Sequence, residues 1–270
     1  MPILNKDMTL CISLAARPSN IGTRFHNRLY DELGLNYIYK AFTTTDLPAA
    51  IGGVRALGIR GCAISMPFKE DVIALVDRMD PSATAIESVN TIVNDDGVLT
   101  AYNTDYLAIA RLLEENAVDS SSSVLLRGSG GMAKAVAAAF RDAGFRRVAI
   151  VARNEEAGRA LATQYGFDWQ PEPGSSTADV LVNVTPLGMA GTDEAAHAFS
   201  DEAITASQLV FDVVALPSET PLIRAARAAG KPVITGAQVI ALQAEEQFVL
   251  YTGVRPSPEQ VRLAGEFSRQ

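Results

Sequence analysis

Several residue types and patterns are scarce in this sequence, and their scarcity excludes particular classes of protein. Cys11 and Cys62 are the two cysteines among 270 residues, and they lie in separate apolar segments without a Cys-x-x-Cys spacing or a nearby histidine. We therefore expect buried, reduced thiols and no metal site. The net charge is −8 and no long run of lysine or arginine offsets it. Nucleic acid and anionic membrane surfaces are thus disfavoured as partners.

Long apolar runs are absent as well. No uninterrupted apolar stretch approaches membrane-spanning length, and the N-terminal segment 1–8 lacks the apolar core of a signal peptide. These absences favour a cytoplasmic protein without a membrane partner. Apolar residues make up 48% of the chain and charged residues 20%, which is ordinary for a soluble globular protein. The 270 residues suffice for one large or two moderate domains.

What the chain does contain is a regular alternation of apolar and helical segments. Its first part predicts strands at 10–15, 37–42 and 61–66, helices at 22–33, 47–57 and 69–76, and a hairpin of strands 91–93 and 98–102. Later strands are predicted from Val124, from Val148 and at 180–184, 209–214 and 232–234, with helices near Asp105 and at 237–250. This alternation is typical of an α/β protein with mostly parallel sheets.

The most informative segment runs from residue 124 to residue 154. An apolar run is followed by the turn Gly128-Ser-Gly-Gly-Met-Ala133, an alanine-rich helix and a second apolar run. This unit has the length and glycine spacing of a dinucleotide-binding fold. Gly128 allows a tight turn, and Gly130 lets the backbone approach a pyrophosphate at the helix N-terminus, where unpaired N–H groups favour anions. A glycine-rich turn without a ligand is the alternative interpretation.

The residue after the second strand of this unit distinguishes between cofactors. NAD-binding domains usually place an acidic residue here, which accepts hydrogen bonds from the ribose hydroxyls. This chain has Arg153, followed by Asn154. A guanidinium presents several donors to a phosphate dianion, so NADP is expected in preference to NAD. We expect two α/β domains flanking a cleft: a Rossmann-type NADP-binding domain at 106–236, and a substrate-binding catalytic domain formed by 1–105 and 237–270.

A second group of polar residues lies in the first part of the chain. Lys69 comes just after the strand that ends at Pro67, and the segments 90–91 and 103–105 flank the hairpin, whose turn brings its two ends together. Amide, hydroxyl and carboxylate groups at strand ends suit a polyhydroxylated ligand. Taken alone, Lys69 is more often a solvated lysine at a helix start, and Asp105 is as often a helix N-cap.

Together these motifs resemble those of the shikimate dehydrogenase family over essentially the whole chain. The family pattern Gly-x-Asn-Val-Thr-x-Pro-x-Lys is similar to residues 61–69, Ala-Val-Asn-Thr to 88–91, and Asn-Thr-Asp to 103–105. The phosphate-binding turn is similar to 128–135, Asn-Arg-Thr to 152–154, Asn-x-Thr-x-x-Gly-Met to 183–189, and the late glycine and glutamine to 236–243.

The resemblance implies NADP-dependent interconversion of shikimate and 3-dehydroshikimate, a step of aromatic amino acid biosynthesis. It implies that Lys69 and Asp105 form the catalytic pair, one of them taking the alcohol proton as hydride leaves for the nicotinamide. The substrate-binding residues would be Ser13, Ser19, Ser65, Asn90 and Gln243. The cofactor-binding residues would be Gly128, Ser129, Gly130, Gly131, Met132, Ala133, Arg153, Asn154, Thr185, Met189, Val213 and Gly236.

The departures from the family pattern concern the substrate. The family usually opens with Ser-x-Ser-Pro-x-x-His-Asn, but residues 13–27 keep only the final His26-Asn27, and the two serines that bind the substrate carboxylate cannot both be placed. Ala63 replaces an asparagine, Ser65 a threonine and Ala215 a tyrosine. These changes resemble the divergent shikimate dehydrogenase-like branch of the family.

The same region contains one additional cation and one histidine. Arg17 is a new cation near the expected carboxylate site, and a surface arginine is the alternative interpretation. His26 is expected to be structural, because nothing in the sequence places a carboxylate beside it.

Two kinds of function therefore remain open. The first is NADP-dependent oxidation of shikimate at low efficiency by a monomer or homodimer, with quinate or a related cyclic hydroxy acid as the alternative substrate. The second is a non-catalytic nucleotide-binding or regulatory protein that keeps the fold. Lys69 and Asp105 favour catalysis, because a protein that only binds a nucleotide does not need both residues.

Overall fold

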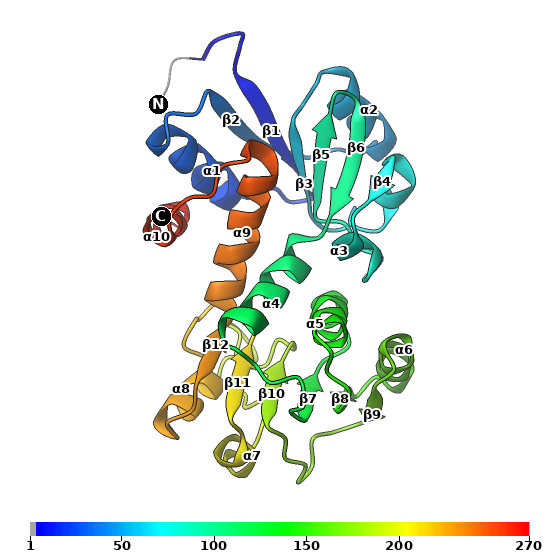
Figure 1. Ribbon diagram of the computed structural model, residues 1–270, viewed down its shortest axis with the longest axis vertical. Helices are drawn as coiled ribbons and strands as arrows, with labels where there is room; N and C mark the ends of the chain where they lie inside the picture. Colours follow the sequence, from blue (N-terminus) through cyan, green and yellow to red (C-terminus); the bar gives the residue numbers. More distant parts are fainter. Residues whose placement is uncertain (1–3, 270) are drawn as a thin grey trace. The chain divides into compact units, whose positions relative to one another are not determined.

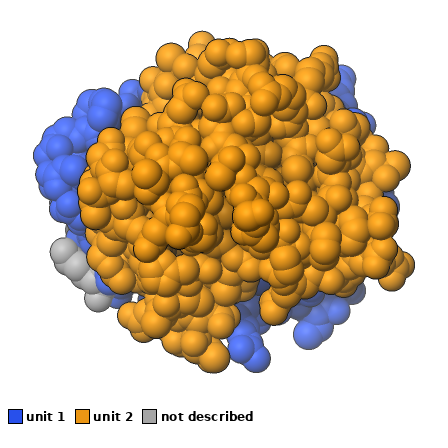
Figure 2. Space-filling model, turned by 90° about the horizontal axis from the view of Figure 1, so that it is seen from below, with its two compact units in different colours: residues 1–104, 241–270 blue, residues 105–240 orange. Residues whose placement is uncertain are grey.

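The computed structural model describes residues 4–269, which form two compact units. The first contains the chain up to Thr104 together with the chain from Ala241 onward, and the second contains Asp105–Ile240; Figure 2 colours them blue and orange. Each unit is an α/β structure with its own sheet, which confirms the predicted fold class.

The first unit is built on a mixed sheet in the order β2-β1-β3-β5-β6-β4 (Figure 1). Strand β1 is parallel to β2 and β3, whereas β5 is antiparallel to both β3 and β6. The carboxyl ends of β1, β3 and β6 and the first residue of β5 therefore meet at one edge. The strands are β1 (Thr9–Leu14), β2 (Tyr37–Phe42), β3 (Gly61–Ile64), β4 (Arg78–Met79), β5 (Thr91–Asp95) and β6 (Val98–Tyr102).

Helices cover both faces of this sheet. On one face, α2 and the short 3₁₀ helix η1 pack Ile51, Val54 and Val72 against Ile12 and Ile64. On the other face, apolar residues of α1, α9 and α10 surround Cys11 and Tyr39. The helices are α1 (Asn20–Glu32), α2 (Leu47–Ala56), η1 (Asp71–Leu75), α3 (Pro81–Thr84), α9 (Gly236–Thr252) and α10 (Pro258–Ser268).

The predicted helix at 69–76 is wrong in its length and type, because only η1 forms there. The carbonyl of Lys69 accepts a hydrogen bond from the backbone N–H of Val89, instead of from a residue one helical turn further along. At the other end, the N–H of Asp77 donates to Leu99 O and draws the chain toward β4, which the sequence did not predict.

The second unit has a wholly parallel sheet in the order β12-β11-β10-β7-β8-β9. This is the strand order of a Rossmann fold, in which ligands bind where the order reverses, here between β7 and β10. The strands are β7 (Val124–Arg127), β8 (Val148–Val151), β9 (Asp168–Gln170), β10 (Val180–Asn183), β11 (Leu209–Asp212) and β12 (Val233–Thr235).

A helix separates each pair of consecutive strands in this unit, except that β9 leads directly to β10. Helices α7 and α8 pack on Leu125, Leu181 and Val210 of the sheet, and the alanine-rich α5 is buried along most of its length. The helices are α4 (Thr104–Glu115), α5 (Gly131–Asp142), α6 (Glu155–Tyr165), α7 (Asp201–Ala206) and α8 (Pro221–Ala228).

The cysteines are free and buried, as predicted. Burial raises the pKa of the Cys11 thiol to about 12, so it stays protonated near neutral pH. In the described residues no group of His, Cys, Asp and Glu side chains could hold a metal ion. The same part of the chain contains no helix long and apolar enough to cross a membrane.

Candidate active site

The predicted phosphate-binding turn lies at the reversal point of the second sheet. Gly128 follows the last residue of β7 and has a φ of +130°, a conformation that side-chain-bearing residues rarely adopt. A Cβ atom there would lie 2.7 Å from Val184 Cγ2 and 3.0 Å from the Val184 carbonyl oxygen, just after β10. Glycine is therefore required at position 128 by the close approach of the two strand ends.

The N-terminus of α5 follows directly. Gly130 is the N-cap, and among the described residues no side chain caps the helix. A Cβ atom at Gly130 or Gly131 would meet no described atom within 4 Å. Open space and helix N–H groups together fit a dinucleotide pyrophosphate. Ser129 and Met132 are partly exposed beside this space, whereas Ala133 is buried beneath it.

Arg153 lies at the carboxyl end of β8 and is exposed. The pKa of Arg127, the last residue of β7, is lowered mainly by burial and additionally by the Arg153 charge, and its ion pair with Glu172 at 3.2 Å opposes this fall. The next residue, Asn154, caps α6 by accepting a hydrogen bond from Ala157 N at 3.0 Å. The predicted cofactor residues Arg153 and Asn154 thus lie between β8 and α6.

Trp169 supports this turn, although no sequence motif marks it. Its indole N–H donates to the Ala152 carbonyl at 3.2 Å. A Cβ atom at Gly158 would lie 2.3 Å from the indole nitrogen, so α6 packs closely on the ring. The indole therefore fixes the backbone immediately before Arg153.

A buried polar network organises the loops after β10 and β11. Asn183 Nδ2 donates to Asp212 Oδ1 at 3.0 Å, and its Oδ1 accepts from Thr185 N and Oγ1 at 3.1 and 2.6 Å. Asp212 also accepts from Thr220 Oγ1 at 2.6 Å and Val214 N at 3.0 Å. Burial raises the pKa of Asp212, while these hydrogen bonds oppose the rise.

The network brings together several predicted cofactor residues. Val213 N donates to Asn183 O at 3.0 Å, which places Val213 next to the loop that carries Thr185. A Cβ atom at Gly236 would lie 2.3 Å from Val213 O, so only glycine fits beside it. Met189 lies further along the first loop and is 46% exposed.

In the first unit, the predicted substrate residues gather at one sheet edge. Val89 N donates to Lys69 O at 2.9 Å and Ile64 N to Asn90 O at 2.8 Å, so the segments of Lys69 and Asn90 lie against the end of β3. Ser65 follows that strand and is exposed. Its N–H donates to Leu14 O at 2.9 Å, at the end of β1.

Asn90 is held by several hydrogen bonds to the protein. Its Oδ1 accepts hydrogen bonds from Thr91 Oγ1 at 2.9 Å, Thr104 N at 2.8 Å and Thr104 Oγ1 at 3.2 Å. Thr104 Oγ1 also lies 3.3 Å from Gln243 Oε1, which brings the glutamine of α9 to the same group. Asp105 directly follows Thr104 in the first turn of α4, where the second unit begins.

The predicted carboxylate-binding serines differ in their surroundings. Ser13 is a partly buried residue of β1, paired with Ala41 and Ala63. Ser19 is the exposed N-cap residue of α1, and it forms no side-chain capping bond within residues 4–269. Of these two serines, Ser13 belongs to the sheet, one residue before the strand end that Ser65 contacts.

His26 is structural, as expected. It is 1% exposed, its Nε2 lies 3.2 Å from Gln247 Oε1, and its ring stacks on Tyr39 with centroids 4.5 Å apart. Burial lowers its pKa to about 4, so the ring is neutral near pH 7. Gln247 was missed, although its position one helical turn after Gln243 on α9 was a usable signal.

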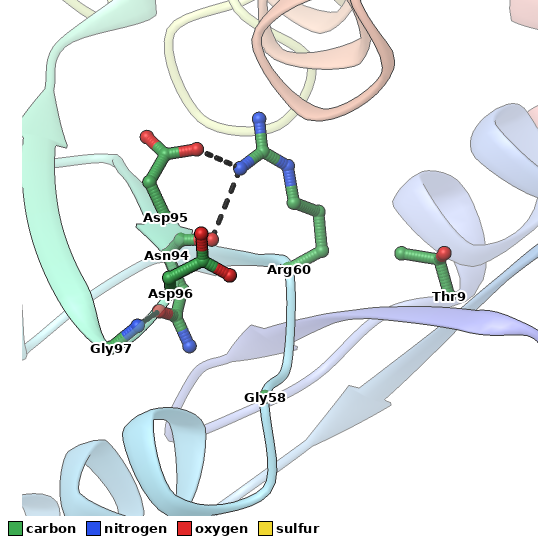
Figure 3. Close-up of a pocket in the computed structure, with 7 residues that line it drawn as sticks. All are labelled: Thr9, Gly58, Arg60, Asn94, Asp95, Asp96 and Gly97. Atoms are coloured by element: carbon green, nitrogen blue, oxygen red, sulfur yellow. Dashed lines mark hydrogen bonds and ion pairs between the residues drawn. The ribbon is translucent and has the colours of Figure 1, made fainter.

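A surface hollow of about 320 Å³ lies at the opposite edge of the first sheet (Figure 3). Arg60 occupies it, donating to Asn94 O at 3.0 Å and Tyr251 O at 3.1 Å and pairing with Asp95. The arginine thus joins the hairpin turn to the end of α9. None of the predicted site residues lines this hollow, whose lining residues are Thr9, Gly58, Arg60, Asn94, Asp95, Asp96 and Gly97.

Comparison with known proteins covers both units. Residues 20–92 match the family described as the shikimate dehydrogenase substrate binding domain. A shikimate dehydrogenase-like protein from Haemophilus influenzae is 56% identical over 268 residues, which span 99% of each chain. A protein named shikimate dehydrogenase (NADP(+)) from Citrifermentans bemidjiense is 36% identical, over 86% of this chain and 85% of that protein.

Solved structures give the same assignment. A shikimate 5-dehydrogenase-like protein superposes with a TM-score of 0.98 at 56% identity, covering 99% of this chain and 100% of that one. Shikimate 5-dehydrogenase from Thermus thermophilus, solved with NADP(H) and shikimate, gives 0.84 at 30% identity over 97% and 100% of the chains. Quinate dehydrogenase from Corynebacterium glutamicum, solved with NAD, gives 0.85 at 28% identity over 96% and 98%. The chain therefore belongs to the shikimate dehydrogenase family.

Proposed function

We propose that the protein is an NADP-dependent dehydrogenase that interconverts shikimate and 3-dehydroshikimate at low efficiency. The first unit binds the ring acid and the second binds the cofactor. The observation that carries the proposal is the gathering of Lys69, Asn90 and Gln243 by contacts at one edge of the first sheet. These groups suit a polyhydroxylated acid and a proton transfer. The family member from Thermus thermophilus was solved with NADP(H) and shikimate, which supports this choice of ligands.

The residues of the second unit fit NADP. Backbone N–H groups at the start of α5 would hold the pyrophosphate, in the open space before Gly130 and Gly131. Arg153 would hold the 2′-phosphate, since its exposed guanidinium has the donor geometry that a phosphate needs. When bound, NADP supplies the nicotinamide carbon that accepts or returns a hydride.

Lys69 and Asp105 handle the proton in this proposal. Oxidation of an alcohol removes a hydride from carbon and a proton from oxygen, so a base must act at the hydroxyl. The neutral Lys69 amine takes that proton, and the ammonium returns it in the reverse direction. The Asp105 carboxylate orients the amine, while the amides of Asn90 and Gln243 hold ring hydroxyls.

The expected low efficiency follows from the remodelled substrate residues. Ser13 is a partly buried residue of β1, in register with Ala63 of β3. Ala63 offers only a methyl group on the same row of the sheet, and Ala215 has no hydroxyl. Lost hydrogen bonds to a charged carboxylate weaken binding and loosen the geometry that hydride transfer requires.

Quinate is the second candidate substrate. It carries one more hydroxyl group than shikimate, and alanine at positions 63 and 215 is smaller than the asparagine and tyrosine of the family pattern. The similarity to a quinate dehydrogenase of Corynebacterium glutamicum favours the same alternative.

A panel of cyclic hydroxy acids tests the proposal. The purified protein is incubated with shikimate, quinate and related ring acids, each with NADP and with NAD, and reduced nicotinamide is followed by absorbance. We expect reduction of NADP in the presence of shikimate, and much less reduction of NAD. Cofactor binding without turnover of any ring acid would instead favour a non-catalytic nucleotide-binding protein.

A further inference from the structure

A chain of buried hydrogen bonds leads from the interior of the first unit to Asn90. His26 Nε2 lies 3.2 Å from Gln247 Oε1, Gln247 Nε2 donates to Thr91 Oγ1 at 2.8 Å, and Thr91 Oγ1 donates to Asn90 Oδ1 at 2.9 Å. The side chains are 1%, 6%, 0% and 5% exposed in that order. Water therefore does not compete for these bonds, which makes each of them costly to break.

His26 determines which groups donate and which accept along this series of hydrogen bonds. Its ring lies parallel to Tyr39 and Phe248, with an interplanar angle of 11° to each, so it cannot turn. A neutral imidazole has one N–H, and placing it on Nε2 gives Gln247 Oε1 its donor. The remaining acceptor, Nδ1, has no hydrogen-bond partner among the described residues. The opposite tautomer would leave a buried N–H unpaired, which is the less favourable arrangement.

The donor and acceptor roles of Gln247 and Thr91 follow from that of His26. With its Oε1 toward His26, Gln247 presents Nε2 to the Thr91 hydroxyl, which accepts that bond. The hydroxyl hydrogen of Thr91 then points to Asn90 Oδ1. Asn90 Oδ1 also accepts a hydrogen bond from the N–H of Thr104, so the oxygen of this amide bonds to groups of the protein itself. The Nδ2 side of the amide is thereby turned away from these donors.

We propose that His26, Gln247 and Thr91 are positioning residues that hold the Asn90 amide in one orientation, with Nδ2 as the donor to a ring hydroxyl of the substrate. This inference rests on the proposed function, in which Asn90 contacts the ring acid. None of the three touches the reacting atoms. They act by preventing rotation of the amide, which would present a carbonyl oxygen to the hydroxyl instead.

Thr91→Val tests the chain most cleanly, because valine keeps the shape and β-branching of threonine and removes the hydroxyl. Thr91→Ser restores the hydroxyl on a smaller side chain. Thr100→Val is the matched control, since Thr100 is a partly buried threonine of neighbouring β6, pairs with Val93 and lies on the same face as Thr91. Kinetic constants are measured for the ring acid and NADP separately.

We expect Thr91→Val to raise the KM for the ring acid about threefold to tenfold, the effect of one hydrogen bond. The KM for NADP stays unchanged, because the residues proposed to hold NADP belong to the second unit. Thr91→Ser and Thr100→Val remain within about twofold of wild type. An unchanged KM for the acid in Thr91→Val, or an equal rise in Thr100→Val, would overturn the proposal.

A second measurement tests the positioning of the Asn90 amide independently of the proposed dehydrogenase activity. Nitrogen-15 relaxation of the Asn90 side-chain amide is measured without ligand. We expect the amide to be as rigid as the backbone in wild type and Thr91→Ser, and mobile on the nanosecond scale in Thr91→Val. If wild type oxidises no ring acid, the proposed function fails while this readout still judges the positioning chain. An Asn90 amide that is equally rigid in Thr91→Val contradicts the chain itself.

Discussion

Lys69 is the side chain on which the proposed chemistry depends most. Lys69→Ala removes the group that takes the alcohol proton, and general-base catalysis typically contributes about 100-fold or more to turnover. We expect kcat to fall by about that factor while the Kd for NADP stays unchanged. Steady-state kinetics and cofactor titration measure both quantities.

The exposed Lys40 on β2 provides the matched control, and Lys40→Ala should leave kcat unchanged. Asp105→Asn should also lower kcat. The losses in the double variant should not add if Lys69 and Asp105 act together. Turnover near the wild-type value in Lys69→Ala would remove Lys69 from the mechanism.

Arg153 determines the choice of cofactor in the proposed function. Arg153→Ala should weaken NADP binding by about 1.5–3 kcal/mol, the range for a hydrogen bond to a charged group, and leave NAD binding almost unchanged. The control is Arg146→Ala, because Arg146 is exposed just before β8, at the opposite end of the strand. Equal weakening of both cofactors would show that Arg153 serves the structure or the shared pyrophosphate.

His26 makes the stability of the first unit depend on pH. Its folded-state pKa of about 4 lies below the ordinary value of 6.5, because burial disfavours the charged ring. The surrounding Tyr30, Tyr39 and Tyr251 stay neutral, since burial raises their pKa values. Below pH 6.5 the unfolded chain therefore binds a proton that the folded chain excludes, and the unfolding free energy falls as pH falls.

This effect can be isolated by comparing wild type with His26→Phe in urea unfolding at pH 7 and pH 4.5. Other titrating groups are common to both proteins, so the difference reports on His26. Wild type should lose about 2 kcal/mol more than His26→Phe between these pH values. Parallel pH dependences would show that His26 is charged in the folded protein.

Single residues also show what the sequence could predict. Lys69, Asn90 and Gln243 were predicted from the resemblance to the family's motifs, and folding brings their segments into contact. Trp169 and Gln247 were not predicted, because their importance comes from partners far along the chain. Trp169 donates to a carbonyl 17 residues away, and Gln247 bonds His26 across 221 positions.

At the scale of one element, the turn between β7 and α5 contains a glycine needed for folding, Gly128, and a glycine proposed to serve cofactor binding, Gly130. Gly128→Ala combines an unfavourable φ with a Cβ atom 2.7 Å from Val184 Cγ2, so the second unit should be destabilised by several kcal/mol. Gly130→Ala meets no described atom within 4 Å and should fold as well as wild type. The added methyl would instead obstruct the pyrophosphate, weakening NADP and NAD alike.

Thermal unfolding and cofactor titration distinguish these variants. We expect a lowered Tm in Gly128→Ala, and a wild-type Tm with impaired binding of both cofactors in Gly130→Ala. Normal cofactor binding by Gly130→Ala would show that no phosphate approaches the α5 N-terminus.

The predictability of the elements follows their length and apolar content. The buried strand β10 was located within one residue, because a continuous apolar run marks it. The edge strand β9 was missed, since Asp168–Gln170 is short and partly exposed. The segment after Lys69 was predicted as a helix, but its hydrogen bonds go to distant residues, which local periodicity does not reveal.

For the whole molecule, two α/β units and a Rossmann-type fold in the second could be predicted, because apolar and helical segments alternate and residues 124–154 have the glycine spacing of a dinucleotide-binding fold. The identity of the substrate does not follow from this pattern. Ala63 and Ala215 differ from the family pattern by being smaller, and a smaller side chain does not specify which ring substituent it accommodates.

The central claim is most directly tested by kcat/KM for shikimate and for quinate with NADP, measured beside an ordinary shikimate dehydrogenase in the same buffer. We predict measurable oxidation of shikimate, with kcat/KM at least about tenfold below the ordinary enzyme, the effect of one lost hydrogen bond to a charged group. Equal efficiency would show that the departures at Ala63 and Ala215 are harmless. Absence of turnover with both acids would contradict the proposed function.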